Sequence, residues 1–445
     1  MSVQEDWDNS LISEVFEQAS FNLEDDILKN AHLILKDMDR GLAKLSSSLA
    51  MQDSKCCLSK MDVSKIYKKD KIIAIDLGGS NLRSSLILFD GGKLEVGQLQ
   101  VVQCKKEYDS YETFFEFIAK NIEYLKDKAC KIAFCFSYAL DFLKEGEAVV
   151  ASLSKDLSVP DIEGKNVGNE LLRALRRDGW KGVESIFVTN DTLATLFAGL
   201  YKKLQVQHDE NQYIQMSKND LSTSFMSIIL GTGLNAAYFA RSEDDAIILE
   251  AGAFDKIARS DFDEMVIKES KENHHHILEK QCSAHYLGAI ALKIFDVLIA
   301  KGAFSPAFKL VLDSKRRDFG NWVFLNALLD HDSKQNTIMQ KNDVCISQYD
   351  KNVMRYVAKQ LMWRVANLLS SLIVAIAMKM KNDRGGSKRL FAVMEGSTIL
   401  KTCGMQVLLK QKVSECLQEI GGVEVEFLTC EHATLSGSAI LMLLL

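Results

Sequence analysis

A β-hairpin with glycines in its turn is predicted at residues 71–89, KIIAIDLGGSNLRSSLILF. One apolar run stops at Asp76, the chain turns through Gly78 and Gly79, and a second apolar run follows. Adjacent glycines let several N–H groups of a turn point into one concavity, where they can bind phosphate, and Asp76 can hold a hydrated Mg²⁺. An ordinary tight hairpin is the alternative explanation for a single turn of this kind.

The same arrangement occurs a second time at residues 227–239, SIILGTGLNAAYF. Here an apolar strand leads into a turn formed by Gly231, Thr232 and Gly233, and an apolar strand returns. Two copies in one chain favour a repeated phosphate-binding element over a chance hairpin.

A strand at about residues 184–188 lies between the two hairpins. It is followed by Asn190, Asp191 and Thr192 at the start of an amphipathic helix. An acidic residue directly after a strand is most often a helix cap, so this role for Asp191 stays open beside a catalytic one.

Four segments in this order, DLGGSNLR, VTNDTLAT, LGTGLNA and LEAGAF, resemble motifs of the eukaryotic hexokinase and glucokinase family. The segments MDRGL at residues 38–42, LRRDGW near Arg176, the LEK and YLG pair at Leu278 and Tyr286, and FAVMEG from Phe391 extend the match. The resemblance therefore covers essentially the whole chain and is far more specific than one glycine motif.

Alternating strand and helix patterns place the chain in the α/β class, with a mixed sheet expected in each lobe. The resemblance implies the two-lobed actin-like ATPase (hexokinase) architecture, with a duplicated core and a cleft between the lobes. The small lobe is expected at residues 71–189, completed by about 432–445, and the large lobe at 1–70 and 190–431. A length of 445 residues agrees with two lobes, because single cores stop growing at smaller sizes.

The resemblance further implies ATP-dependent phosphorylation of the 6-hydroxyl of a hexose, glucose before fructose or mannose, as the entry step of glycolysis. Mg²⁺ would accompany ATP. Asp191 would be the base, because the junction of a strand and a helix holds its carboxylate rigidly, and Arg83 would stabilise the transferring phosphoryl group. Lys155 is the third catalytic residue implied.

A hexose pocket should contain carboxylates, amides and hydroxyls, because every sugar hydroxyl both donates and accepts. By resemblance, the sugar-binding residues are Ser137, Ser154, Lys155, Asn190, Asp191, Asn235, Glu250 and Glu279. Glutamates such as Glu250 and Glu279 are, taken singly, more often surface carboxylates.

The nucleotide site is expected at the two hairpins, with the adenosine held near residues 395–397. The implied residues are Asp76, Gly78, Gly79, Ser80, Asn81, Arg83, Gly231, Thr232, Gly233, Glu395, Gly396, Ser397 and Thr434. Asp76 would hold Mg²⁺ through water.

The chain departs from the family pattern beside the sugar and near the C-terminus. Tyr138 and Ala139 stand where the family has Phe-Pro, and Ala251 stands where it has Trp. Leu435 and Ser436 interrupt a run that is glycine-rich in the family. These two residues should limit the approach of the backbone to the ribose, so we expect a weak requirement for adenine.

Composition narrows the classes of partner and compartment. The net charge of −6 offers no basic surface for nucleic acid. No signal peptide and no apolar segment of membrane-spanning length is expected, so we predict a cytoplasmic protein, with monomer or homodimer left open. The ten cysteines are expected to be free, mostly buried thiols without structural zinc. The triplet His274–His276 is expected to be a solvated polar turn.

Two other functions remain as alternatives. A catalytically silent relative that senses sugar or regulates a partner would keep the fold, but the acidic and basic residues named above argue against it. A chaperone-like ATPase of the same superfamily would lack the sugar carboxylates.

Overall fold

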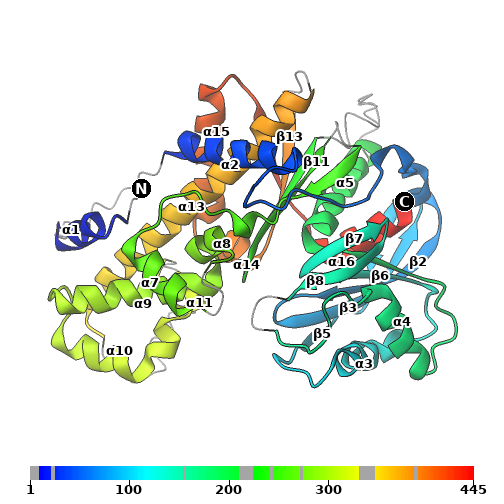
Figure 1. Cartoon of the computed structure of the whole chain (residues 1–445), viewed down its shortest axis with the longest axis horizontal. Helices are drawn as coiled ribbons and strands as arrows, with labels where there is room; N and C mark the ends of the chain where they lie inside the picture. The colour runs from blue at the N-terminus through cyan, green and yellow to red at the C-terminus, as the bar shows by residue number, and fades with distance from the viewer. Residues whose placement is uncertain are drawn as a thin grey trace.

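The computed structural model describes residues 10–21, 26–153, 157–209, 224–240, 244–270, 274–329, 346–384 and 389–445. Over these residues the chain forms two lobes, each containing one large mixed β-sheet (Figure 1). The α/β class and the two-lobed arrangement predicted from the sequence are confirmed.

The sheet of the small lobe has the strand order β4-β3-β2-β6-β9, and β5 pairs with residues 81–84 of β3, whereas β4 pairs with residues 87–90. The first predicted hairpin is β2 and β3, and its register pairs Asp76 with Arg83. A separate two-stranded hairpin, β7 and β8, follows β6. The strands are β2 Asp70–Leu77, β3 Asn81–Asp90, β4 Lys93–Val96, β5 Gln100–Gln103, β6 Lys131–Phe136, β7 Ala139–Lys144, β8 Glu147–Ser152 and β9 Ser185–Thr189.

The sheet of the large lobe has the order β1-β12-β11-β10-β13-β14. The second predicted hairpin is β10 and β11, with Leu230 opposite Leu234 at the turn. The strands are β1 Gln52–Asp53, β10 Phe225–Leu230, β11 Leu234–Ala240, β12 Asp245–Ile248, β13 Arg389–Glu395 and β14 Glu424–Thr429.

The two sheets repeat one plan. In each, three antiparallel strands (β4-β3-β2 and β12-β11-β10) are followed by two parallel strands (β6-β9 and β13-β14). The duplication inferred from the two glycine turns therefore extends to the strand order around them.

Two helices exchange partners between the lobes. Helix α5 (Asp191–Asp209) follows β9 but packs on β10, β11 and β13, whereas α16 (Ala433–Leu444) follows β14 but packs on β2, β3 and β6. The helices cross where Gly437 meets the backbone of Ala194, because a Cβ at Gly437 would lie 1.8 Å from the Ala194 carbonyl oxygen. The lobes are therefore joined by a close helix crossing that only glycine permits.

The remaining helices cover the sheets, mostly on the large lobe (Figure 1). They are α1 Ser10–Gln18, α2 Ile27–Leu42, α3 Tyr111–Asn121, α4 Val167–Arg177, α7 Asp261–Glu269, α8 Ile277–Cys282, α9 Ala284–Ala300, α10 Pro306–Phe319, α11 Trp322–Ala327, α13 Gln348–Arg384, α14 Ser397–Lys401 and α15 Met405–Glu419, with 3₁₀ turns at Leu58–Lys60, Val63–Tyr67, Glu123–Leu125 and Ala251–Ala253. Residues 58 and 66 pack with small-lobe strands and α16, so part of the first seventy residues belongs to that side. The other lobe boundaries expected from the sequence stay predictions.

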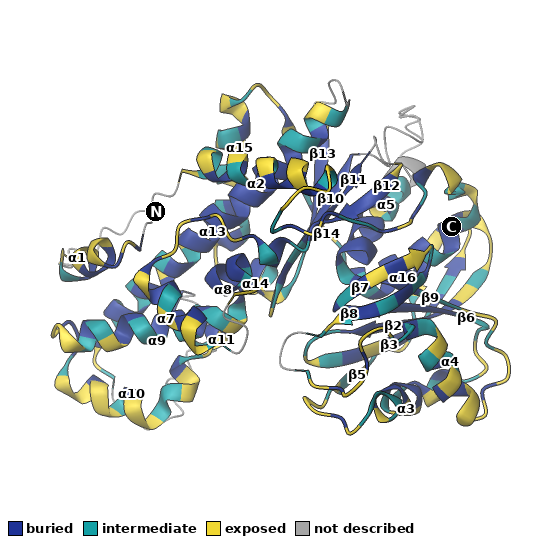
Figure 2. Cartoon of the chain, in the orientation of Figure 1, coloured by how far each residue is buried: buried dark blue, intermediate teal, exposed yellow. Residues whose placement is uncertain are grey.

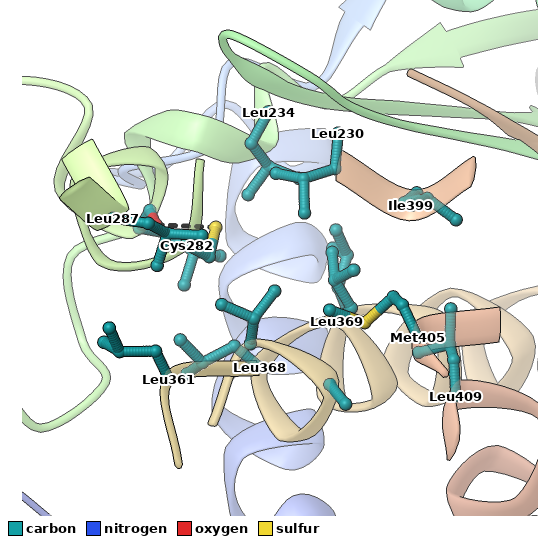
Figure 3. Close-up of a cluster of buried hydrophobic side chains, with 14 of the residues drawn as sticks. Leu230, Leu234, Cys282, Leu287, Leu361, Leu368, Leu369, Ile399, Met405 and Leu409 are labelled. Carbon is teal, nitrogen blue, oxygen red and sulfur yellow. Dashed lines mark hydrogen bonds between the residues drawn. The ribbon is translucent and has the colours of Figure 1, made fainter. Parts of the chain in front are cut away.

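Helix α13 forms the centre of the large-lobe core. Leu361, Leu368 and Leu369 from this helix pack against Leu230 of β10 and Met405 of α15, all fully buried or nearly so (Figure 3). A helix that is apolar on all sides is stable only where its surroundings are apolar too, and here α2, α9 and α15 supply them.

The length of α13 corrects one expectation. Residues 348–383 are long and apolar enough to cross a membrane by length and composition alone, although no such segment was expected. In this fold 83% of the apolar window is buried inside the chain, as in the core helix of a globular protein. Figure 2 shows the helix largely in the buried class.

The cysteines correct a second expectation. All nine that fall in the described residues are free thiols, but only Cys56, Cys135 and Cys282 are buried. The expectation that most would be buried is therefore wrong.

Candidate functional site

Both glycine turns line one cleft, together with the ends of β6, β9 and β13 and the start of α16. Each turn is closed by a backbone hydrogen bond of 3.0 Å, from Gly78 N to Asn81 O and from Gly231 N to Gly233 O. The side chain of Thr398 also donates to Gly231 O, at 3.1 Å, and ties the second turn to α14.

The reason for glycine in these turns differs from the one expected. Neither Gly78 nor Gly231, the first glycine of each turn, has a positive φ. An added Cβ at Gly78 or Gly231 would lie 3.7 Å from the nearest atom, which is an ordinary contact. At Gly78 and Gly231 glycine is therefore not required by the backbone, and its effect is to leave room for a ligand close to the main chain.

Asp76 is a buried carboxylate at the end of β2, with only 2% of its surface exposed. Its Oδ2 accepts hydrogen bonds from Arg83 Nη1 at 3.0 Å and from Thr434 Oγ1 at 2.8 Å. The register of β2 and β3 explains the first contact, and the first turn of α16 supplies the second. Arg83 stays 44% exposed beside this pair.

A Mg²⁺ held through water fits this arrangement. No group of three or more His, Cys, Asp or Glu residues among those described could hold a metal alone. Mg²⁺ in phosphotransfer sites is bound by one or two carboxylates, water and the nucleotide phosphates, which needs no such group. Asp76 is the carboxylate best placed to contribute, beside the first turn.

Asp191 is the first residue of α5 and lines the cleft. The capping acceptor of the helix is instead Asn190, whose Oδ1 accepts from Thr192 Oγ1 and Leu193 N, both at 2.9 Å. Asp191 Oδ1 accepts a hydrogen bond from the neighbouring Thr192 N at 2.8 Å. The helix is thus capped by Asn190 and not by Asp191. The amide nitrogen of Asn190 is the group that can donate to a ligand.

Asn235 and Glu250 form a hydrogen-bonded pair in the same cleft. Asn235 Nδ2 donates to Glu250 Oε1 at 2.9 Å, and Asn235 Oδ1 accepts from Ala236 N at 2.7 Å. Glu250 itself has a φ of 52°, a left-handed conformation that is unfavourable for a residue with a side chain. Such strain is typical of functional positions.

Glu279 lies on α8 and reaches the second glycine turn. Its Oε2 accepts from Leu234 N at 2.8 Å. Gly252 packs against it so closely that an added Cβ would lie 3.1 Å from Glu279 Cβ. Asn235, Glu250 and Glu279, which were all predicted to bind the sugar, therefore lie in the same part of the cleft.

The strand end at Glu395 forms the wall beside the second turn. Gly396 has a φ of 99°, and a Cβ there would lie 2.3 Å from Leu230 O, so this position requires glycine. Burial raises the pKa of Glu395, and the nearby Asp76 and Asp191 charges add to this, while the Gly396 amide and Arg83 oppose it.

The C-terminal segment differs from the expectation. Thr434 lines the cleft, but Leu435 is buried in the apolar cluster between the lobes and Ser436 Oγ donates to His432 O at 2.9 Å. The side chains of Leu435 and Ser436 therefore do not face the cleft. The predicted weak requirement for adenine loses its physical basis.

Most of the predicted residues line this one cleft, and a few do not. Ser80 and Asn81 lie at the first turn without lining it, and Ala251 is fully buried. Ser154 and Lys155 lie outside the described residues. The residues of the predicted sets that do line the cleft are Asp76, Gly78, Gly79, Arg83, Ser137, Asn190, Asp191, Gly231, Thr232, Gly233, Asn235, Glu250, Glu279, Glu395, Gly396, Ser397 and Thr434.

Several residues at or near the cleft were given no contact in the sequence analysis. His276 lines the cleft with a left-handed backbone, so only His274 and His275 are the exposed turn that was expected. Tyr138 OH donates to Gly78 O at 3.4 Å, and Lys106 Nζ donates to Gly79 O at 3.3 Å. The position of His276, three residues before Glu279, was the available signal.

Comparison with known proteins agrees with the fold. Two family models described as hexokinase match residues 14–201 and 225–444. Hexokinase-2 of Candida albicans is 26% identical over 291 residues, which cover 58% of this chain and 54% of that protein. Human hexokinase-2 is 23% identical over 400 residues, which cover 83% of this chain and 41% of that protein. The chain thus spans about half the length of the curated relatives it matches.

Solved structures show the same fold at low identity. A hexokinase from Schistosoma mansoni complexed with glucose superposes with a TM-score of 0.77 at 19% identity and covers 98% of this chain and 99% of that one. A second hexokinase crystal structure gives a TM-score of 0.73 at 21% identity, with the same coverage. The chain belongs to the hexokinase family.

Proposed function

We propose that the chain transfers the γ-phosphoryl group of ATP to the 6-hydroxyl of a hexose. The observation that supports this most is that Asp191, Asn235, Glu250 and Glu279 line the same cleft as both glycine turns. A sugar acceptor and a triphosphate donor would then meet in one space, as phosphoryl transfer requires.

Each residue has a defined task in this proposal. Asp191 accepts the proton of the 6-hydroxyl as the oxygen attacks phosphorus, and Asn190 orients a neighbouring hydroxyl through its amide nitrogen. Glu250 and Glu279 accept hydrogen bonds from ring hydroxyls. Arg83 faces the transferring phosphoryl group, and Mg²⁺ brought with ATP would neutralise charge on the phosphates.

The low identity to known hexokinases leaves a silent sugar sensor as the second candidate function. A sensor needs Asn235, Glu250 and Glu279 to bind hexose, but it has no use for a base at Asp191. Turnover therefore separates the two candidates, whereas sugar binding does not.

The test is a coupled assay of ADP release, run with and without Mg²⁺ and with glucose, fructose, mannose or no sugar. We expect release to require both Mg²⁺ and a hexose, because closure around sugar excludes water as acceptor. Glucose binding without ADP release would favour the sensor. Rapid release without sugar would favour an ATPase of the chaperone type.

A further inference from the structure

Tyr138 places a hydroxyl group at the first glycine turn. Its OH donates to Gly78 O at 3.4 Å, and the residue lines the cleft although only 5% of its surface is exposed. Hydroxyl donors normally lie about 2.5–3.0 Å from their acceptors, so this bond is long. An oxygen of a bound phosphate carries charge and would be a stronger acceptor for the same proton than the carbonyl is.

The backbone holds Tyr138 beside this turn. Strands β2 and β6 run parallel with Leu77 opposite Phe136, and Ser137 N donates to Leu77 O at 3.0 Å. The residues that follow β6 therefore lie alongside the residues that follow β2. Since β2, β3 and β6 belong to one sheet, closure of the lobes would not separate Tyr138 from the first turn.

The ring of Tyr138 is fixed by packing. It lies against Phe136, with ring centroids 5.3 Å apart, and Phe136 in turn meets Phe134 and Phe114 edge to face. A hydroxyl on a ring with this support changes its position little, as preorganised stabilisation of charge requires. Burial also raises the pKa of the Tyr138 hydroxyl, so the group stays protonated near neutral pH and acts as a donor.

The charge of the cleft favours a neutral donor at this point. Among the described residues that line the cleft, Arg83 is the one lysine or arginine, against the five carboxylates of Asp76, Asp191, Glu250, Glu279 and Glu395. A triphosphate brings further negative charge. Donors besides Arg83 are therefore needed, and a hydroxyl supplies one without the cost of burying another charge.

The position of Tyr138 between two subsites indicates which phosphate it meets. Ser137, its neighbour in the chain, is expected to bind the sugar, and Gly78 is expected to bind phosphate. The group that passes from one substrate to the other lies where these two subsites meet. The hydroxyl of Tyr138 should therefore face the transferring phosphoryl group and not the adenosine, which is expected near residues 395–397.

We propose that Tyr138 is a further catalytic residue, whose hydroxyl donates to an oxygen of the γ-phosphoryl group during transfer; this rests on the proposed function. The bond from O6 of the hexose to the γ-phosphorus forms, the bond from that phosphorus to the bridging oxygen of ADP breaks, and the 6-hydroxyl proton passes to Asp191. Tyr138 keeps its own proton throughout. Its hydrogen bond stabilises the negative charge spread over the phosphoryl oxygens in the transition state.

Tyr138→Phe removes the hydroxyl and keeps the ring, so it tests the proposal directly. We expect kcat with glucose and ATP to fall about 10- to 100-fold, the effect of one hydrogen bond to a charged group, with both KM values nearly unchanged. A purely structural role in supporting the first turn would raise the KM for ATP instead. Unchanged kcat would overturn the proposal, and so would a loss confined to the KM for ATP.

Tyr108→Phe is the matched control. Tyr108 is also a nearly buried tyrosine of the small lobe, but its OH accepts from Lys105 N and it is not among the residues that line the cleft. This variant should keep the kcat of the wild type. The thermal midpoints of both variants should stay close to the wild-type value, because each loses a single hydroxyl. An equal fall of kcat in the two variants would overturn the proposal.

A transition-state mimic gives a second readout that does not depend on turnover. ADP, Mg²⁺ and aluminium fluoride, added together with glucose, imitate the phosphoryl group during transfer. Calorimetry should show Tyr138→Phe binding this mixture about 10- to 100-fold more weakly than the wild type does, with a non-hydrolysable ATP analogue bound equally by both. Equal binding of the mimic would overturn the proposal.

Failure of this inference can be told from failure of the proposed function. An active wild type with an unchanged Tyr138→Phe would overturn the inference alone. No turnover of any hexose by the wild-type chain would overturn the proposed function and the inference with it.

Discussion

The Thr434 hydroxyl donates to the Asp76 carboxylate across 2.8 Å, although the two residues are 358 positions apart. The bond joins the first turn of α16 to the end of β2. Because α16 follows the last strand of the large lobe and packs on the small-lobe sheet, this contact links the nucleotide end of the cleft to the connection between lobes.

Thr434→Val should weaken nucleotide use more than sugar use. The substitution removes a donor from a buried carboxylate, and hydrogen bonds to charged groups contribute about 1.5–3 kcal/mol. We expect the KM for ATP to rise and unfolding in urea to need less denaturant, with the KM for glucose little changed. Thr434→Ser, which keeps the hydroxyl, is the control, and an equal loss in Thr434→Ser would contradict the role of the bond.

Asp191→Ala should lower kcat by at least about 10²–10⁴-fold, the range for a lost general base. Sugar binding, measured by calorimetry, should weaken less. Since the helix is capped by Asn190, the thermal midpoint should stay close to that of the wild type. Turnover within a few fold of wild type would show that Asp191 is not the base.

Glu250→Gln and Glu279→Gln should each raise the KM for glucose sharply and leave the KM for ATP nearly unchanged. Each substitution keeps the shape of the side chain but replaces a charged acceptor oxygen by an NH2 group that cannot accept from a sugar hydroxyl, and hydrogen bonds to charged groups are the stronger ones. The steady-state kinetics of both substrates measure this. Parallel rises for glucose and ATP would mean that the lobes, not the sugar contacts, had changed.

The sequence predicted those parts of the fold that depend on local pattern. Both hairpins and the strand before Asp191 were expected from alternation and from the position of glycine, and all are present. The sheet order around the hairpins was not predictable, because parallel pairing such as β10 with β13 joins residues more than 160 positions apart.

Side-chain direction was harder to predict than position. Leu435 lies next to a cleft residue, yet one step along a helix turns a side chain by about 100°, so it faces the core between lobes. His276 is the opposite case. It was expected in a solvated turn, but its backbone is left-handed and the residue lines the cleft. Ser154 and Lys155, known only from the motif, stay predictions.

Gly437→Ala should disturb the helix crossing. Its Cβ would lie 1.8 Å from the Ala194 carbonyl oxygen, so α5 and α16 must move apart. Overpacking of this kind costs about 1–3 kcal/mol, measured by urea unfolding. Gly182→Ala is the matched control, because nothing lies within 4 Å of its Cβ and its φ is not positive. Equal stability of the two variants would contradict the crossing.

Glu395→Gln should stabilise the protein above the ordinary pKa of a glutamate, and the effect should grow with pH before it levels off. Burial raises the pKa of Glu395, so over the window that begins near the ordinary glutamate pKa of 4.5 the unfolded chain loses this proton while the folded chain keeps it. The folded state then binds more protons than the unfolded state, and the free energy of unfolding falls as pH rises through this window. Glutamine has no titratable proton, so the free energy of unfolding of the variant does not fall in this window. Urea unfolding of both proteins from pH 4.5 to pH 8 measures the difference, with Glu419→Gln, an exposed position on α15, as the control. A constant difference across this range would show that Glu395 titrates alike in the folded and unfolded chain.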